Sequence, residues 1–175
     1  MKRLLVIIAL CQSLFGLGQE VRNERVYNQV LTSKEVHNGQ FVWKMKKAGD
    51  ISNLSKEIST SKVKTDDWMP AIVPGTVLNS LVYNKIYPEP YYGLNNKITS
   101  NLIPDLYNTG NEFYTYWFRT EFSLNENEYK GRKIWLQVDG INYRAEIWLN
   151  GNMVGNIAGM FYQDFIDISE YAKFD

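Results

Sequence analysis

Residues 91–96, YYGLNN, bring together side chains that are suited to holding a sugar. Tyr91 and Tyr92 supply aromatic rings, and Asn95 and Asn96 supply amide groups. A sugar presents C–H faces that pack on aromatic rings, and hydroxyl groups that exchange hydrogen bonds with amides. These residue types therefore predict a saccharide-binding loop. The alternative is structural, because tyrosines can pack under a loop and asparagines often form its turns.

The rest of the chain offers little catalytic chemistry. Asp67 and Asp105 are carboxylic acids outside the predicted strands, but an Asp that follows a proline, as Asp105 does, is typically a turn or cap residue. The chain has one Cys, Cys11, and one His, His37, too few for a zinc site or a cysteine-based triad. His37 lies in a polar segment and is expected on the surface. We expect no catalytic residue, no metal and no cofactor in this chain.

The N-terminus has the pattern of a secretory signal peptide over residues 1–18. A basic start precedes an apolar run that is too short to span a membrane, and small residues precede Gln19. Cys11 raises the alternative of a lipoprotein anchor, but Leu10 stands where a small residue is expected. We therefore predict soluble export, to a periplasm or to the cell exterior.

Composition narrows the class of partner. Cleavage after residue 18 would remove Lys2 and Arg3 from the 19 basic residues, leaving 17 against 19 acidic ones and a net charge of −2. No basic stripe remains to follow phosphates, so nucleic acid is not an expected partner. The same cleavage would remove the only Cys, so no internal disulfide is expected. The length of 175 residues suits one ordinary domain.

Alternation of apolar and polar residues predicts the strands that position the loop. In residues 140–155, the alternate positions from Ile141 to Leu149, Tyr143 among them, are apolar and are expected to face inward. Asn150-Gly151 then supplies a hairpin turn. Further strands are predicted within 41–49, 113–124, 132–140 and 159–171. Residues 50–66 are interpreted as loop, with a short strand as an option. Short strands joined by Gly and Asn turns are typical of a β-sandwich.

One short helix is predicted between these strands. Thr76 can cap it, an apolar stripe follows from Val77 to Val82, and Pro88 and Pro90 are expected to stop it. Residues 91–112 then form a long irregular stretch. Loops of this length are usually functional or disordered, and the aromatic residues of this one argue against disorder.

Four large side chains share the outward parity of two predicted strands: Trp117, Arg119, Arg144 and Trp148. We interpret them as an exposed face that docks a neighbouring domain. Sugar binding is one alternative, and pairing of the arginines with Glu121 or Glu146 across strands is another.

Seven motifs, in order along the chain, resemble the N-terminal sugar-binding domain of glycoside hydrolase family 2. They are AIVPGTVLNSL, PEPYYGLNN, IPD, YWFRTEF, GINYRAEIWLNGNMVG, GMF and DIS. The PEPYYGLNN and IPD pair is most similar to exo-β-D-glucosaminidases and endo-β-mannosidases, and then to β-mannosidases. The resemblance runs from about Trp68 to the C-terminus. It implies an all-β, galactose-binding-like jelly-roll sandwich over residues 41–175 with one short helix, after a loose lead-in over 19–40.

The resemblance also implies what surrounds this domain. In the family it precedes an immunoglobulin-like domain and a catalytic (β/α)₈ barrel, whose two glutamates act as acid/base and nucleophile in a retaining mechanism. Neither glutamate has a counterpart in this sequence, so the resemblance implies a glycosidase parent and no hydrolysis by this chain alone. In the family, further strands follow a segment like DISEYAKFD. We therefore expect a sandwich that is incomplete at its C-terminus, and a sequence that is the first piece of a longer protein.

The resemblance assigns roles to two loops. In the family, the loop that matches 91–96 reaches the rim of the active site, and an Asn matching Asn95 can contact the terminal sugar. Glu89 stands where the family often has Asp, which weakens any role that needs a short carboxylate. Gly159-Met160-Phe161 resembles a second loop toward the active site, and makes Met160 and Phe161 substrate-binding candidates. The alternative for Phe161 is an ordinary core position.

Together these patterns predict the carbohydrate-binding, substrate-rim domain of a secreted β-glycosidase of β-glucosaminide or β-mannoside type. Its expected partners are a β-linked oligosaccharide or glycan and the family's other domains, without a membrane span. A freestanding carbohydrate-binding or adhesion module is the first alternative, and a remnant without function is the second.

Overall fold

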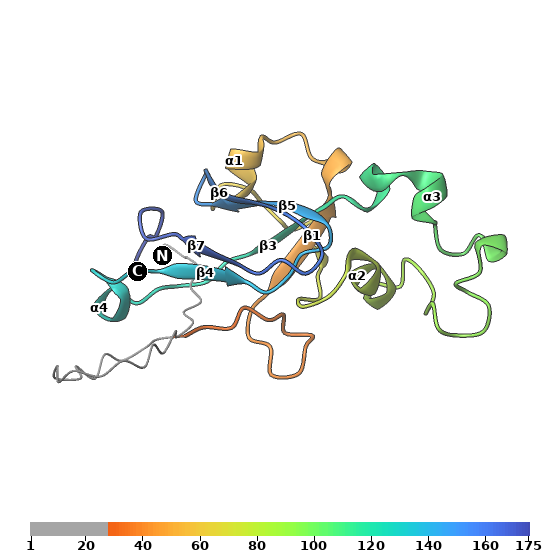
Figure 1. Cartoon of the computed structure of the whole chain (residues 1–175), viewed down its shortest axis with the longest axis horizontal. Helices are drawn as coiled ribbons and strands as arrows, with labels where there is room; N and C mark the ends of the chain where they lie inside the picture. Colours follow the sequence, from red (N-terminus) through yellow and green to blue (C-terminus); the bar gives the residue numbers. More distant parts are fainter. Residues whose placement is uncertain (1–27) are drawn as a thin grey trace. The chain divides into compact units, whose positions relative to one another are not determined.

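The computed structural model describes residues 28–175, and Figure 1 shows the whole chain. The predicted signal peptide, residues 1–18, lies outside the described residues. The chain forms two compact units, of which one runs from Leu31 to Glu121. The other contains residues 122–175 together with the described residues 28–30.

A three-stranded antiparallel sheet organises the unit Leu31–Glu121. Strand β1 (Trp43–Lys47) lies between β2 (Met69–Pro70) and β3 (Tyr116–Thr120). The strands predicted within 41–49 and 113–124 are thus confirmed in their central parts. The second is shorter than expected, because residues 111–114 turn into a 3₁₀ helix, η3 (Asn111–Tyr114), before the strand begins.

The core of this unit forms where the three strands meet helix α2 (Val77–Tyr83). Met45, Ala71 and Leu81 are buried at its centre. Met45 is the β1 residue opposite both Met69 and Phe118, so alternation along β1 directs it inward. The partly buried residues packed against this centre are Trp43, Met69, Val77, Tyr87, Tyr114, Tyr116 and Phe118. Tyr116 and Phe118 therefore lie on the core side of β3.

Helix α2 begins as its sequence predicts. The Thr76 hydroxyl accepts a hydrogen bond from the Asn79 backbone N–H at 3.0 Å, which satisfies one of the free donors at the helix start. The helix ends at Tyr83, before the two prolines expected to stop it. Asn84 supplies the end instead, because its side-chain amide donates to the carbonyls of Ser80 at 2.6 Å and Pro70 at 2.8 Å.

Short helices are more numerous than the single one expected. Among the described residues, this unit also contains η1 (Ala48–Asp50), α1 (Ser55–Ile58), η2 (Ile98–Ser100) and α3 (Leu106–Thr109). The optional strand within 50–66 is wrong, because residues 55–58 form α1. The Glu57 carboxylate accepts a hydrogen bond from the Leu54 backbone N–H at 3.3 Å, which favours this helical turn.

The other unit contains two antiparallel strand pairs. Strand β4 (Trp135–Val138) pairs with β7 (Asp164–Asp167), and β5 (Arg144–Leu149) pairs with β6 (Asn152–Ala158) as the hairpin visible in Figure 1. A short helix, α4 (Glu126–Tyr129), precedes β4. The strands predicted within 132–140, 140–155 and 159–171 are confirmed.

The hairpin turn matches its sequence closely. Asn150 and Gly151 both adopt positive φ angles, 50° and 92°, as the two central residues of a tight turn. The Asn150 side-chain amide donates to the Tyr171 carbonyl at 2.8 Å. Tyr143 was expected on the inward parity, and that prediction is wrong: β5 begins only at Arg144, and the Tyr143 side chain is exposed.

The inward face of the β4–β7 pair packs against the hairpin. Leu136 and Ile166 lie opposite each other in the pair and are both buried. A Cβ atom at Gly155 of β6 would lie only 2.6 Å from the Ile166 Cδ1 atom, so glycine at this position lets Ile166 fit. The other buried apolar residues of this unit are Phe122, Leu124, Tyr129, Ile134, Ile157 and Ile168.

The Gly151→Ala variant is expected to destabilise the protein by about 1 kcal/mol, because a Cβ atom disfavours the left-handed region. Urea unfolding of the purified protein measures this. Gly49→Ala is the matched control, since nothing lies within 4 Å of its added Cβ atom and its φ is not positive. Equal midpoints for the two variants would contradict the assignment of the turn.

Candidate functional site

The first candidate loop, residues 88–101, is held in shape by its own polar groups. The Asn95 side-chain amide donates to the Glu89 carbonyl at 2.9 Å, and the Ser100 hydroxyl donates to the Asn95 carbonyl at 3.1 Å. Asn95 therefore ties the beginning of the loop to its end and is half-buried. This favours the turn interpretation for its amide nitrogen, whereas Asn96 is exposed.

The two tyrosines of this loop project outward. Tyr91 is 89% exposed and Tyr92 is 76% exposed, so the interpretation in which they pack under the loop is wrong. The Glu89 carboxylate accepts a hydrogen bond from the Tyr91 backbone N–H at 3.3 Å. Glu89 thereby fixes the backbone beneath the rings. The loop presents aromatic faces that are free to stack on a ligand.

Tyr114 anchors the chain just after the loop. Its hydroxyl donates to the Pro104 carbonyl at 2.6 Å. Burial, and then the neighbouring Tyr87 and Tyr116, raise the pKa of Tyr114, so the hydroxyl keeps the proton that this bond requires. Asp105 caps α3 by accepting the Tyr107 backbone N–H at 3.2 Å. The structural role predicted for Asp105 is confirmed.

Sequence reasoning missed how far the exposed apolar surface extends beyond Tyr92. The further exposed apolar residues of the loop, of α3 and of the chain between them are Leu94, Ile98, Leu102, Leu106 and Tyr107. Their signal was present in the sequence, because apolar residues recur through a stretch that has no strand or long helix to bury them. The accessible surface of this segment is therefore wider than YYGLNN.

The second candidate loop joins β6 to β7. Gly159 has a φ of 136°, and its N–H donates to the Tyr143 carbonyl at 2.8 Å, which turns the chain at the end of the hairpin. Phe161 is 90% exposed, so the core alternative for this residue is wrong. Met160 is also exposed. The structure thus groups Tyr91, Tyr92, Asn95 and Asn96 in one unit, and Met160 and Phe161 in the other.

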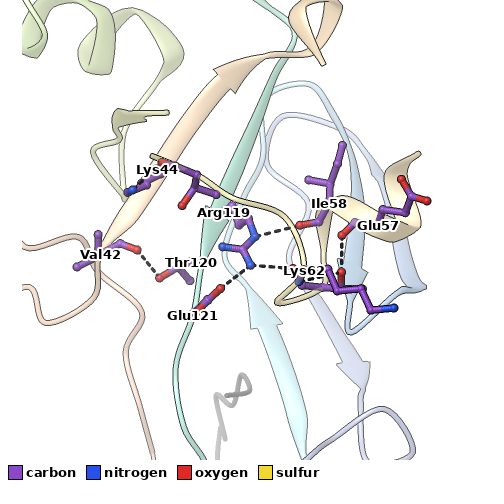
Figure 2. A network of polar contacts seen from close by, with 10 residues as sticks. Val42, Lys44, Glu57, Ile58, Lys62, Arg119, Thr120 and Glu121 are labelled. Carbon is purple, nitrogen blue, oxygen red and sulfur yellow. Dashed lines mark hydrogen bonds and ion pairs between the residues drawn. The ribbon is translucent and has the colours of Figure 1, made fainter. Parts of the chain in front are cut away.

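Arg119 does not belong to an exposed face. Figure 2 shows its guanidinium directed at Glu121 and at the chain around Ile58. It donates to the carbonyls of Ile58 and Thr60, each at 3.0 Å, and to the Glu121 carboxylate at 2.5 Å, and its side chain is only 12% exposed. The expected docking role is wrong for Arg119, because α1 and the turn after it cover this side chain. Arg119 does pair with Glu121, but the two residues are neighbours along the same segment, so the expected pairing across strands is not what forms.

The other three members of the predicted outward face differ in their exposure to solvent. Arg144 is exposed, whereas Trp117 and Trp148 are half-buried. The Trp148 indole N–H donates to the Glu146 carboxylate at 3.0 Å. Glu146 therefore contacts the neighbouring ring on its own strand.

Two further carboxylates, Asp67 and Asp167, serve the fold. Asp67 forms an ion pair with Lys46, and the hydrogen bond from Lys46 holds the pKa of its carboxyl below the usual value. Hydrogen bonds from Lys133 and Ser169 lower the pKa of Asp167 to about 2. Both acids are therefore engaged in contacts that hold the chain together.

The described residues, 28–175, hold no sign of a metal site or a membrane span. No group of three or more His, Cys, Asp or Glu side chains among them is placed to bind a metal ion. No helix among them is long and apolar enough to cross a membrane. His37 is exposed, as expected.

A profile of the family described as "Glycosyl hydrolase 2 galactose-binding domain-like" matches residues 43–175. The chain therefore belongs to this family, which confirms the all-β, galactose-binding-like class.

Individual glycosidases are also similar to this chain in sequence. The mannosylglycoprotein endo-beta-mannosidase of Lilium longiflorum is 44% identical over 105 residues, which are 59% of this chain and 10% of that protein. The exo-beta-D-glucosaminidase of Hypocrea jecorina is 27% identical over 146 residues, or 80% of this chain and 15% of that protein. The chain thus spans between about a tenth and a seventh of the length of these relatives.

A solved structure shares the fold. The crystal structure of the Amycolatopsis orientalis exo-chitosanase CsxA superimposes with a TM-score of 0.62 at 21% sequence identity. The similarity covers 77% of this chain and 15% of that one.

The Arg119→Lys variant is expected to lower the free energy of unfolding by about 1–3 kcal/mol, because a lysine cannot reproduce the fork that reaches two carbonyls and a carboxylate. Urea unfolding measures the loss. The control, Arg144→Lys on an exposed side chain, should change stability by less than about 0.5 kcal/mol. Similar losses for both variants would show that the network of Figure 2 does not hold α1 in place.

Asp167 makes the stability of the folded protein depend on pH in the acidic range. Its folded pKa of about 2 lies below its usual value, so its contribution is complete above about pH 4 and is lost as the pH falls toward 2. The native protein should therefore lose more stability across this window than Asp167→Asn does. Urea midpoints at several pH values measure the difference, and Asp66→Asn, which removes the same charge from an exposed side chain, should follow the native slope.

Proposed function

We propose that this chain is the carbohydrate-binding, substrate-rim part of an exported β-glycosidase that acts on β-mannosides or β-glucosaminides. The observation that carries the proposal is the outward projection of Tyr91 and Tyr92 from a loop braced by Asn95. Family membership supports it, as do relatives named for endo-β-mannosidase and exo-β-D-glucosaminidase activity.

The chemistry of the loop suits recognition. An exposed tyrosine ring offers its face to the C–H groups of a sugar, and its hydroxyl can donate or accept one hydrogen bond. The exposed Asn96 adds an amide that can bind a neighbouring hydroxyl. The Asn95 and Glu89 contacts hold the backbone in place, so little conformational freedom remains to be lost when a sugar binds.

Hydrolysis is assigned to the rest of the protein. A retaining glycosidase needs two carboxyl groups about 5–5.5 Å apart across the scissile bond. Asp67 and Asp105 are engaged with Lys46 and with the start of α3, which leaves them structural roles. The proposal therefore includes an immunoglobulin-like domain and a catalytic barrel elsewhere in the protein. It also includes export directed by residues 1–18.

The size of the native protein is the decisive first measurement. Source cells and medium are blotted with an antibody raised against residues 60–170. A band far above 20.4 kDa, the mass of these 175 residues, supports the glycosidase. The native protein is then assayed on nitrophenyl β-D-glucosaminide and nitrophenyl β-D-mannoside. A band near 20 kDa would instead favour a freestanding binding module.

In the native protein, Tyr92→Ala is expected to lower kcat/KM on the better of these glycosides by about three- to tenfold, because one ring contact with the sugar is lost. Tyr92→Phe should keep most of the activity, since it retains the ring. Tyr83→Ala is the control, because Tyr83 is a half-exposed tyrosine at the end of α2 rather than in the loop. Unchanged kinetics for Tyr92→Ala would remove this loop from the substrate rim.

A further inference from the structure

The outward face of the β4–β7 pair carries aromatic rings that neither candidate loop contains. In this pair Trp135 lies opposite Asp167, and Gln137 lies opposite Phe165. Their neighbours in the two strands, Leu136 and Ile166, are buried, so alternation directs these four side chains to the other face. Both Trp135 and Phe165 are exposed there.

The two rings are diagonal neighbours on this face. Phe165 is two residues before Asp167, the partner of Trp135. Diagonal positions in an antiparallel pair are about 7–8 Å apart, within reach of large aromatic side chains. The rings therefore form a short aromatic track across the two strands. Unlike the rings of the candidate loops, these rings stand on paired strands, which are held by backbone hydrogen bonds and by the buried residues of the opposite face.

Polar groups beside the rings are already fixed. The Gln137 side-chain amide donates to the Asp139 carboxylate at 2.6 Å. The Asp167 carboxylate accepts from Lys133 at 2.6 Å and from the Ser169 hydroxyl at 2.5 Å. Groups held in this way can exchange hydrogen bonds with a ligand without first losing much side-chain entropy.

We infer that this face, made of Trp135, Gln137, Phe165 and Asp167, binds a β-linked polysaccharide chain. The mixture of groups favours a sugar over a protein, because the centres of protein interfaces are depleted in charged residues, whereas on this face the Asp167 carboxylate lies opposite Trp135 and two residues from Phe165. A sugar polymer likewise presents C–H faces and hydroxyl groups side by side. The inference rests on the proposed function in taking glycans as the ligand class.

The test measures retention of the native protein on beads of chitosan and of β-1,4-mannan. Chitosan is a cation, so the buffer contains about 0.5 M NaCl to screen charge attraction. Phe165→Ala and Trp135→Ala should each weaken binding to the retaining polysaccharide by about three- to tenfold. Phe165→Tyr keeps the ring and should bind as the native protein does. Tyr83→Ala is the matched control, since Tyr83 is 49% exposed and Phe165 is 48% exposed.

Three results would overturn the inference: no retention of the native protein, equal retention of Phe165→Ala and Tyr83→Ala, or weaker retention of Phe165→Ala together with an altered unfolding midpoint or oligomeric state. The last would mean that the face packs against protein. Hydrolysis of the soluble nitrophenyl glycosides by the native protein judges the proposed function separately. The inference can thus fail while the glycosidase assignment stands, and the reverse also holds.

Discussion

Hydrogen bonding along both edges of β1 is the constraint on which the first candidate loop depends. This loop belongs to the segment 71–115, an excursion of the chain between β2 and β3. At its start the Ala71 N–H donates to the Trp43 carbonyl at 3.0 Å. At its end the Thr115 carbonyl accepts from the Ala48 N–H at 2.9 Å. Because Met45 is fully buried between these points, β1 cannot shift its register without exposing the core. Both ends of the excursion are therefore fixed by one strand.

Between those two ends, side-chain hydrogen bonds add to the core contacts that Leu81 and its neighbours make. The buried Ser80 hydroxyl accepts the Ile72 N–H at 3.0 Å, and Ser33, also buried, accepts the Val73 N–H at 3.2 Å. These contacts satisfy backbone groups that would be costly to bury alone. Farther along, Asn95 braces the loop itself, and Tyr114 holds the chain just after it. Polar bracing lets the chain keep large apolar side chains in solvent, a state that usually marks an interaction site.

Caps and turns could be predicted from the sequence, whereas contacts between distant segments, which decide which side chains are covered, could not. Thr76 and the Asn150-Gly151 pair act within a few residues, so their types alone predict a cap and a turn. Arg119 is covered by the carbonyls of Ile58 and Thr60, which lie about 60 residues earlier in the chain. Alternation predicts which side chains share a face of a strand, but it does not predict what covers that face. The exposure of Phe161 follows the same logic, because an isolated aromatic residue in a loop has no periodicity to orient it. The substrate-binding roles of the two candidate loops were predicted from residue types and from family resemblance, and they stay predictions.

The rings of the 91–96 loop and those of the β4–β7 face are held in their orientations by different interactions. The rings of the 91–96 loop depend on a few hydrogen bonds within residues 89–100. On the β4–β7 face, Trp135 and Phe165 point outward because Leu136 and Ile166 must point inward, and a slip of one residue would exchange the two sets. Core packing therefore fixes the strand-borne rings, including the fit of Ile166 against Gly155. A rigid track suits a repeating polymer, whereas a loop with its own bracing can vary without disturbing the fold.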